Sequence, residues 1–182
     1  GYHGWHDWYI SANIKSKKKL DKHLLPGVST LGVPKVLKNL AIPFEFNNPK
    51  DFIKKFQSNI KSLGCVVLEP ARSNHASNEF LKVIKNLCKK NDVPLIVDEI
   101  TLGWHCTLGG YHKVRNLVPD IAVFSKGTTN GFPLGVIIGK KKIMKAAKET
   151  FISSAYWSEN IGFAAAIATI NYMKKNNVSK KL

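Results

Sequence analysis

Four short, almost continuous apolar segments constrain what this chain can fold into. They are CVVLE (65–69), PLIVDE (94–99), DIAVFS (120–125) and LGVIIG (134–139). Each is too short for a core helix, and its apolar residues do not alternate with polar ones, which is the pattern of a strand covered on both faces. The sequence therefore predicts a mainly parallel β-sheet buried between other elements.

Amphipathic segments of helical period separate or follow these strands. Their large apolar residues recur at spacings of three and four, which places them on one face of a helix. Strands that alternate with helices predict an α/β fold, a three-layer arrangement with a mainly parallel sheet and helices on both faces. The expected helices lie within 49–62, 78–91, 141–151 and 159–175.

The connection between the last two strands is unusually short. Only residues 126–133 join the segment 120–125 to the segment 134–139. A parallel crossover through a helix needs a dozen or more residues. The last strand is therefore expected to be antiparallel or to be reached by an unusual loop.

The charge of the chain has two interpretations. The formal net charge is +16, which is typical of proteins that bind nucleic acid. Almost all of the positive charge is lysine, since Arg72 and Arg115 are the only arginines. Arginine reads guanine edges and clamps phosphates with two bonds, so a lysine-rich chain indicates a solvated surface rather than a nucleic-acid interface. Such a surface can still attract anionic substrates.

The cysteines and the apolar runs exclude several classes of protein. Cys65, Cys88 and Cys106 are widely spaced and form no CxxC pair, so we expect neither a disulfide framework nor a metal site. Cys65 and Cys88 lie on apolar segments and are expected in the core. A reducing compartment, the cytoplasm, fits free thiols. No apolar run reaches the roughly 18 residues that span a bilayer, so no membrane partner is expected.

Three ionisable residues stand at the ends of three successive predicted strands. Glu69 closes the first, Asp98 closes the second, and Lys126 follows the third. Ligands of open parallel sheets bind at the carboxyl ends of the strands, where one crevice could collect these side chains. A partly desolvated lysine can form a Schiff base with an aldehyde cofactor, and an ionised carboxylate can keep a pyridine nitrogen protonated. This pairing indicates pyridoxal 5′-phosphate (PLP) chemistry.

Four sequence motifs give the chain a family resemblance. They resemble, in order, the stacking motif, the Glu-Pro segment, the strand with the pyridine partner and the cofactor-lysine segment of class III (fold-type I) PLP-dependent aminotransferases. The glutamate-1-semialdehyde 2,1-aminomutase-like group is the most similar. The motifs are GYHGWHDWY (1–9), VVLEPAR (66–72), LIVDEITLGW (95–104) and FSKGTTNGFPLGVIIGKKKIM (124–144).

The resemblance implies a role for individual residues. Lys126 is expected to carry the cofactor as a Schiff base and to move the proton at the substrate carbon. Asp98 is expected to pair with the pyridine nitrogen, while Tyr2 and Ile100 cover opposite faces of the ring. Glu69 is expected near the 3′ hydroxyl of the cofactor or near the substrate.

Two further assignments follow from the same resemblance. His3 and Gly4 are expected to shape the turn that presents Tyr2. The family donates a Thr across its dimer interface to the cofactor phosphate, and this chain has Ala155 at that place, so Ser154 or its neighbour Ser153 is the expected substitute. A homodimer is therefore expected.

The resemblance also implies a domain organisation and a function. Residues 1–175 are expected to be the central part of a truncated PLP-binding large domain, and 176–182 the start of a C-terminal region, so the chain is expected to be a fragment. The expected activity is PLP-dependent amino-group transfer between a small-molecule amino donor and a keto or aldehyde acceptor. The alternatives are a glutamate-1-semialdehyde 2,1-aminomutase and a degenerate, non-catalytic basic binding module.

Overall fold

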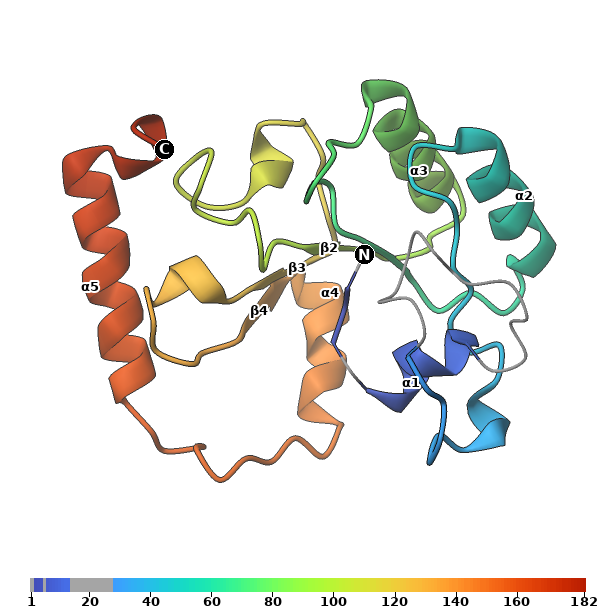
Figure 1. Ribbon diagram of the computed structural model, residues 1–182, viewed down its shortest axis with the longest axis horizontal. Coiled ribbons are helices and arrows are strands. Elements are labelled where there is room, and N and C mark those ends of the chain that lie inside the picture. Colours follow the sequence, from blue (N-terminus) through green and yellow to red (C-terminus); the bar gives the residue numbers. More distant parts are fainter. Residues whose placement is uncertain (1, 5, 14–27) are drawn as a thin grey trace.

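The computed structural model describes residues 2–4, 6–13 and 28–182, and its centre is a four-stranded sheet (Figure 1). The strands lie in the order β1-β2-β3-β4. The first three are parallel and β4 is antiparallel to β3, which confirms a mainly parallel sheet and decides between the two expectations for the last strand. The bounds are β1 Val66–Leu68, β2 Leu95–Asp98, β3 Ile121–Phe124 and β4 Val136–Gly139.

The register of the sheet brings the ends of the parallel strands to one edge. Val66 of β1 pairs with Leu95 of β2, and Asp98 of β2 pairs with Val123 of β3. Since these strands run in the same direction, the residues that follow them leave the sheet on the same side. The fold therefore gathers the strand ends as the sequence predicts.

Two helices cover one face of the sheet, α2 (Pro49–Asn59) and α3 (Asn78–Lys90), and they pack against each other (Figure 1). Asn48 and Ser77 each accept a hydrogen bond from the amide three residues later. Such caps satisfy amides that have no partner within the helix. Both predicted helices are confirmed, and α3 forms the crossover from β1 to β2.

The main hydrophobic core lies between these helices and the sheet. Phe52, Phe56, Phe80 and Ile84 are each at most 3% exposed, and they belong to the stripes that the helical spacing predicts. Phe44, from the segment before α2, adds its ring to those of Phe52 and Phe80. These ring contacts stabilise the core beyond the burial of apolar area alone.

One of the two cysteine predictions is wrong. Cys88 lies in the core as expected, but Cys65 is exposed. The strand β1 begins one residue later, and Val66 and Leu68 are the members that face the core. Side chains alternate along a strand, so Cys65 points to the opposite side.

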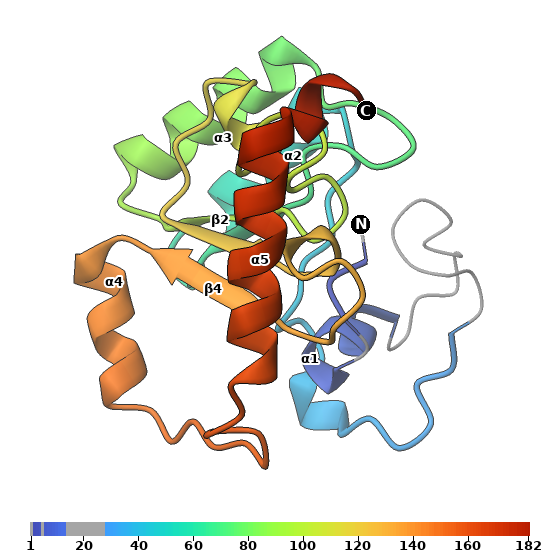
Figure 2. The same ribbon diagram turned by 90° about the vertical axis from the view of Figure 1, so that its left-hand side faces the viewer.

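Further helices lie on the other side of the sheet. Figures 1 and 2 show α1 (Asp7–Ile10) and α4 (Lys141–Met144) opposite α2 and α3, which agrees with the three-layer prediction. The long helix α5 (Ile161–Asn176) runs past one side of the sheet and contacts the turn after β3. The 3-10 turns are η1 Ser11–Asn13, η2 Lys35–Leu37, η3 Tyr111–Lys113, η4 Lys126–Thr128, η5 Lys145–Lys148 and η6 Val178–Lys180.

The lengths of the helices and their apolar character relate to two expectations, the absence of a membrane span and the boundary after residue 175. Within the described ranges, no helix is both long enough and apolar enough to cross a bilayer. The helix α5 ends at Asn176, next to the boundary expected between 175 and 176. The division of the chain into two regions at that point stays a prediction.

Candidate active site at the carboxyl ends of the strands

The side chains predicted from the strand ends differ in burial. Glu69 and Asp98 are 7% and 6% exposed, whereas the Lys126 side chain is exposed. Asp98 ends β2, and Lys126 begins the turn η4 after the neighbouring strand β3. The strand ends thus place a buried carboxylate and an exposed amine on neighbouring strands. A partly desolvated lysine was expected here, but the described residues leave the Lys126 side chain exposed to solvent.

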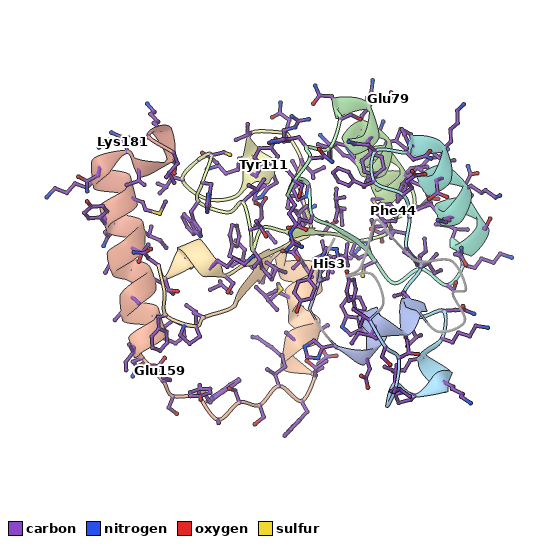
Figure 3. All side chains as sticks on the ribbon, in the orientation of Figure 1. His3, Phe44, Glu79, Tyr111, Glu159 and Lys181 are labelled. Carbon is purple, nitrogen blue, oxygen red and sulfur yellow. The ribbon has the colours of Figure 1, made fainter. Side chains whose placement is uncertain are left out.

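Asp98 is held by two partners. Its Oδ2 lies 2.8 Å from Nδ1 of His3, and its Oδ1 accepts a hydrogen bond from the Ile100 amide at 3.0 Å. A carboxylate only accepts hydrogen bonds, so Nδ1 is the protonated nitrogen of His3 when this contact forms. The contact joins residues 95 positions apart and brings the N-terminal segment to the end of β2 (Figure 3).

The N-terminal segment presents two tyrosines with different surroundings. The Tyr2 ring is 43% exposed and meets the Tyr9 ring edge-on, with centroids 6.2 Å apart. Tyr9 is buried, and this burial raises the pKa of its hydroxyl to about 12. Gly4 has a φ of 98°, which suits glycine in the turn that leads on from Tyr2. Tyr2 is therefore supported on one edge, and a substantial part of its ring is accessible to a planar ligand.

Glu69 carries a buried oxygen with no hydrogen-bond partner among the described residues. The atom is Oε2, and the nearest cation is NH1 of Arg72 at 4.0 Å, which is too far for a hydrogen bond. An unsatisfied buried carboxylate oxygen costs free energy. Such an atom at a strand end indicates a place where a polar ligand can add the missing bond.

Lys126 stands in an unusual backbone conformation. Its φ is 40°, and its Nζ donates a hydrogen bond to Oγ1 of Thr101 at 3.1 Å. Thr101 lies in the loop that leaves β2, so this contact links the ends of β2 and β3. The amine is therefore directed toward the neighbouring strand end rather than into bulk solvent alone.

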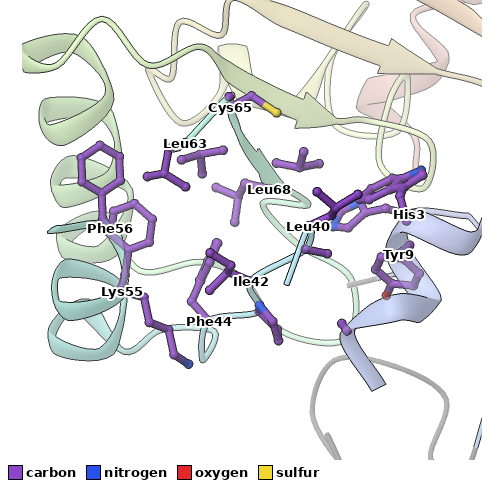
Figure 4. Close-up of a pocket in the computed structure, with 18 of the residues that line it drawn as sticks. His3, Tyr9, Leu40, Ile42, Phe44, Lys55, Phe56, Leu63, Cys65 and Leu68 are labelled. Atoms are coloured by element: carbon purple, nitrogen blue, oxygen red, sulfur yellow. The ribbon is translucent and has the colours of Figure 1, made fainter. Parts of the chain in front are cut away.

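A large cavity of about 440 Å³ lies beside β1, between α2 and the segment 39–46 (Figure 4). His3 and Tyr9 line one end of it, and Glu69 is also among its lining residues. Its lining includes neither Asp98 nor Lys126, and it is mostly apolar. The cavity therefore borders the strand-end site without being that site.

The comparison with known proteins identifies the family. A family model described as "Aminotransferase class-III" matches residues 1–182. The chain belongs to the class-III aminotransferase family. It is 27% identical to the 2'-deamino-2'-hydroxyneamine transaminase of Streptomyces kanamyceticus, over 98% of this chain and 41% of that protein. It is 32% identical to the glutamate-1-semialdehyde 2,1-aminomutase of Nitrosopumilus maritimus, over 98% of this chain and 43% of that protein.

Solved structures show the same fold. The FumI protein of Sphingopyxis sp. MTA144, in its PLP internal aldimine form, superposes with a TM-score of 0.80 at 20% identity, over 96% of this chain and 39% of that one. An omega-transaminase from Sphaerobacter thermophilus gives 0.79 at 19% identity, over 94% and 42%. The expected fold class is confirmed, and the chain spans less than half the length of these relatives.

Several residues around the candidate site were not predicted from the sequence. Thr101, Trp104 and Thr128 contact Lys126 or its turn, and although they lie within the quoted motifs, no role was assigned to them. Their position close behind Asp98 or Lys126 was the available signal. Glu99 binds the loop after β2, through the amides of Tyr111 and His112 and through Nδ1 of His112.

Ser154 lies in an exposed segment between η5 and α5. Its Oγ accepts a hydrogen bond from the Tyr156 amide. Within the described ranges, it makes no hydrogen bond to Lys126, Asp98 or Glu69. The role expected for Ser154 involves a second subunit, and it stays a prediction.

Proposed function

We propose that this chain forms the PLP-binding part of an aminotransferase in which Lys126 holds the cofactor. One observation carries the proposal. A buried carboxylate, Asp98, and an accessible amine, Lys126, both lie at the carboxyl ends of neighbouring strands. Membership of the class-III aminotransferase family supports the same activity.

The residues present fit this cofactor. Asp98 has acceptor capacity beyond its bonds to His3 and Ile100, because a carboxylate offers about four lone-pair sites. The unpaired Oε2 of Glu69 can accept a hydrogen bond from a ligand hydroxyl. The Lys126 amine is exposed, so it is accessible to an aldehyde.

Each residue then has a defined task. Bound PLP supplies an aldehyde that bonds to a primary amine and a protonated ring that withdraws electrons from the reacting carbon. Asp98 stabilises the positive charge on the ring nitrogen, since an opposite charge nearby favours the protonated form. Tyr2 and Ile100 would cover the two faces of the bound ring, and His3 would orient Asp98. Lys126 moves the proton at the substrate carbon.

The substrates and partners are proposed at the level of their chemistry. The amino donor and the keto or aldehyde acceptor are small molecules, and the positive charge favours anionic ones. We place the enzyme in the cytoplasm as a homodimer, with neither nucleic acid nor membrane as a partner. The exposed Phe151, Tyr156 and Trp157 beside Ser154 support an interface there, because such apolar clusters mark contact surfaces.

A second candidate is an intramolecular transfer, the aminomutase reaction. The observation in its favour is the 32% identity to the aminomutase of Nitrosopumilus maritimus. The same residues serve both reactions, because both move an amino group through the cofactor. Assays of amino donors with keto acceptors, with glutamate 1-semialdehyde as one substrate, separate the two.

The decisive experiment locates the cofactor on the chain. PLP reacts with many exposed lysines, so the protein is mixed with PLP, reduced with borohydride and mapped by mass spectrometry. Before reduction, a visible absorption band is expected that Lys126→Ala removes. After reduction, Lys126 is expected to carry the label at the lowest PLP concentration. The exposed Lys141→Ala serves as the matched control and keeps the band. Labelling spread evenly over surface lysines would refute the enzyme proposal and favour the basic binding module.

A further inference from the structure

The turn that carries Lys126 has a strained backbone. A φ of 40° lies in the left-handed region, which residues with a Cβ rarely adopt. Lys126 begins η4 directly after Ser125, which follows the end of β3. A residue other than glycine stays in such a conformation only where its surroundings hold it. The contacts around Lys126 therefore decide where its amine points.

Trp104 touches the chain on both sides of Lys126. Its Nε1 donates a hydrogen bond to Oγ1 of the buried Thr128 at 2.9 Å, and the Thr128 hydroxyl donates in turn to the Ser125 carbonyl at 2.9 Å. The indole also lies against the Phe124 ring, with centroids 5.8 Å apart. One side chain thus contacts the residues before and after the strained position.

Trp104 is itself held in place by its own loop and by the turn η6. Its φ is 74°, its amide donates to the Gly109 carbonyl at 2.6 Å, and its carbonyl accepts from Oγ of Ser179 at 2.7 Å. A Cβ on Gly103 would lie 2.6 Å from the Glu99 carbonyl oxygen, so only glycine lets the loop pass here. The indole therefore acts from a fixed base.

The same loop also reaches the reactive amine, because Oγ1 of Thr101 accepts the hydrogen bond from Nζ of Lys126. We propose that Trp104 is a positioning residue, which holds the Lys126 turn through Thr128 so that the amine points toward Thr101. The proposal rests on the proposed function, because only that function makes the direction of this amine important. If Trp104 acted by packing alone, another aromatic ring would replace it without effect.

Conservative substitutions separate the hydrogen bond from the packing. Trp104→Phe keeps an aromatic ring against Phe124 and removes the N–H donor. Thr128→Val removes the hydroxyl, whereas Thr128→Ser retains it. The control is Trp8→Phe, since Trp8 is 41% exposed on α1 and no ring contact or hydrogen bond joins it to the Lys126 turn in the described ranges. Melting temperatures establish that each variant is folded.

The first measurement needs no cofactor. Hydrogen exchange of the Thr128 amide, which is bonded to the Ser125 carbonyl at 2.9 Å, reports the stability of the turn. We expect it to exchange about fivefold faster in Trp104→Phe, the size typical of one lost hydrogen bond. Thr128→Ser and Trp8→Phe should match the parent chain. In the double variant Trp104→Phe/Thr128→Val, the amide of residue 128 should exchange no faster than in Thr128→Val alone. The reason is that Thr128→Val already removes the bond that Trp104→Phe removes.

The second measurement uses PLP and borohydride. The concentration of PLP that half-labels Lys126 should rise about fivefold in Trp104→Phe, as for one lost hydrogen bond, while labelling of Lys141 stays constant. Unchanged exchange of the Thr128 amide in Trp104→Phe would overturn the positioning role, and so would an equal loss of protection throughout β2 and β3. If the parent chain does not label at Lys126, the proposed function fails, and hydrogen exchange still decides the role of Trp104.

Discussion

Glu99 offers the sharpest test of how the loop after β2 is held. Its side chain is fully buried, and its two oxygens accept three hydrogen bonds, each 2.8 Å long. Oε2 accepts from the Tyr111 amide, and Oε1 accepts from the amide and Nδ1 of His112. Glu99 directly follows β2 and Tyr111 is twelve positions later, so this carboxylate ties the far end of the loop to the strand end (Figure 3).

The substitution Glu99→Gln keeps the shape and replaces one oxygen with an NH₂ group. In either orientation of the glutamine side chain, its NH₂ group faces a backbone N–H, so that hydrogen bond is lost. The remaining hydrogen bonds are weaker because their acceptor no longer carries a negative charge. A hydrogen bond to a charged group contributes about 1.5 to 3 kcal/mol, so losing one and weakening two should lower the free energy of unfolding by about 2 to 4 kcal/mol.

Urea denaturation measures this loss as a shift of the midpoint at constant slope. The matched control is Glu149→Gln, because Glu149 is exposed, and we expect its effect to stay within about 0.5 kcal/mol. A loss below about 1 kcal/mol for Glu99→Gln, within the range of one neutral hydrogen bond, would refute the reasoning. Such a result would mean that the loop is held by contacts other than the carboxylate.

Three further predictions concern the sheet, the core and the thiols. Partial burial alone would raise the pKa of Asp120, but its bonds to the Leu95 amide and to Lys140 outweigh it and lower the pKa below 3.8. Its contribution is therefore complete above about pH 4 and is lost as the pH falls through the lowered value. Asp120→Asn should destabilise the chain by about 1.5 to 3 kcal/mol at pH 7, and urea titrations should show this difference shrinking toward pH 2. Phe80→Ala, at a side chain that is 0% exposed, should cost about 3 to 5 kcal/mol in the same assay; a loss under 1 kcal/mol would contradict the core described above. Burial raises the pKa of the Cys88 thiol to about 12, so at pH 8 a thiol reagent should modify the exposed Cys106 first and Cys88 only after unfolding, as peptide mapping would show.

Local pattern was sufficient for most of the fold. The continuous apolar runs gave β1 to β4 within one or two residues. In β1 to β3 the reason is that a covered strand excludes polar side chains. The expectation that β4 is buried is wrong for the described residues, since its Ile137 and Ile138 are 59% and 52% exposed. Spacings of three and four gave α2 and α3, because only one stripe of each helix meets the core. Cys65 was misplaced because one residue beyond a strand end reverses the side that a side chain faces.

The residues of the candidate site could be predicted only where an ionisable side chain stands at the end of a strand. Asp98 and Lys126 met that condition, and parallel strands align their ends in any such sheet. The contact of His3 with Asp98 spans 95 positions, and nothing periodic in the sequence encodes it. It depends on the path of the N-terminal segment over the sheet, which is a property of the whole fold.

The sequence by itself thus determined the order of strands and helices, the lysine-rich charge and the two residues on which PLP chemistry is proposed to depend. Only the tertiary structure decided that Glu99 clamps a loop, that Thr101 receives the Lys126 amine and that Trp104 supports its turn. The physical reason is the distance along the chain between the residues that interact. Hydrophobic periodicity is set by neighbours a few residues apart, whereas hydrogen bonds between loops depend on how strands far apart in the chain are brought side by side.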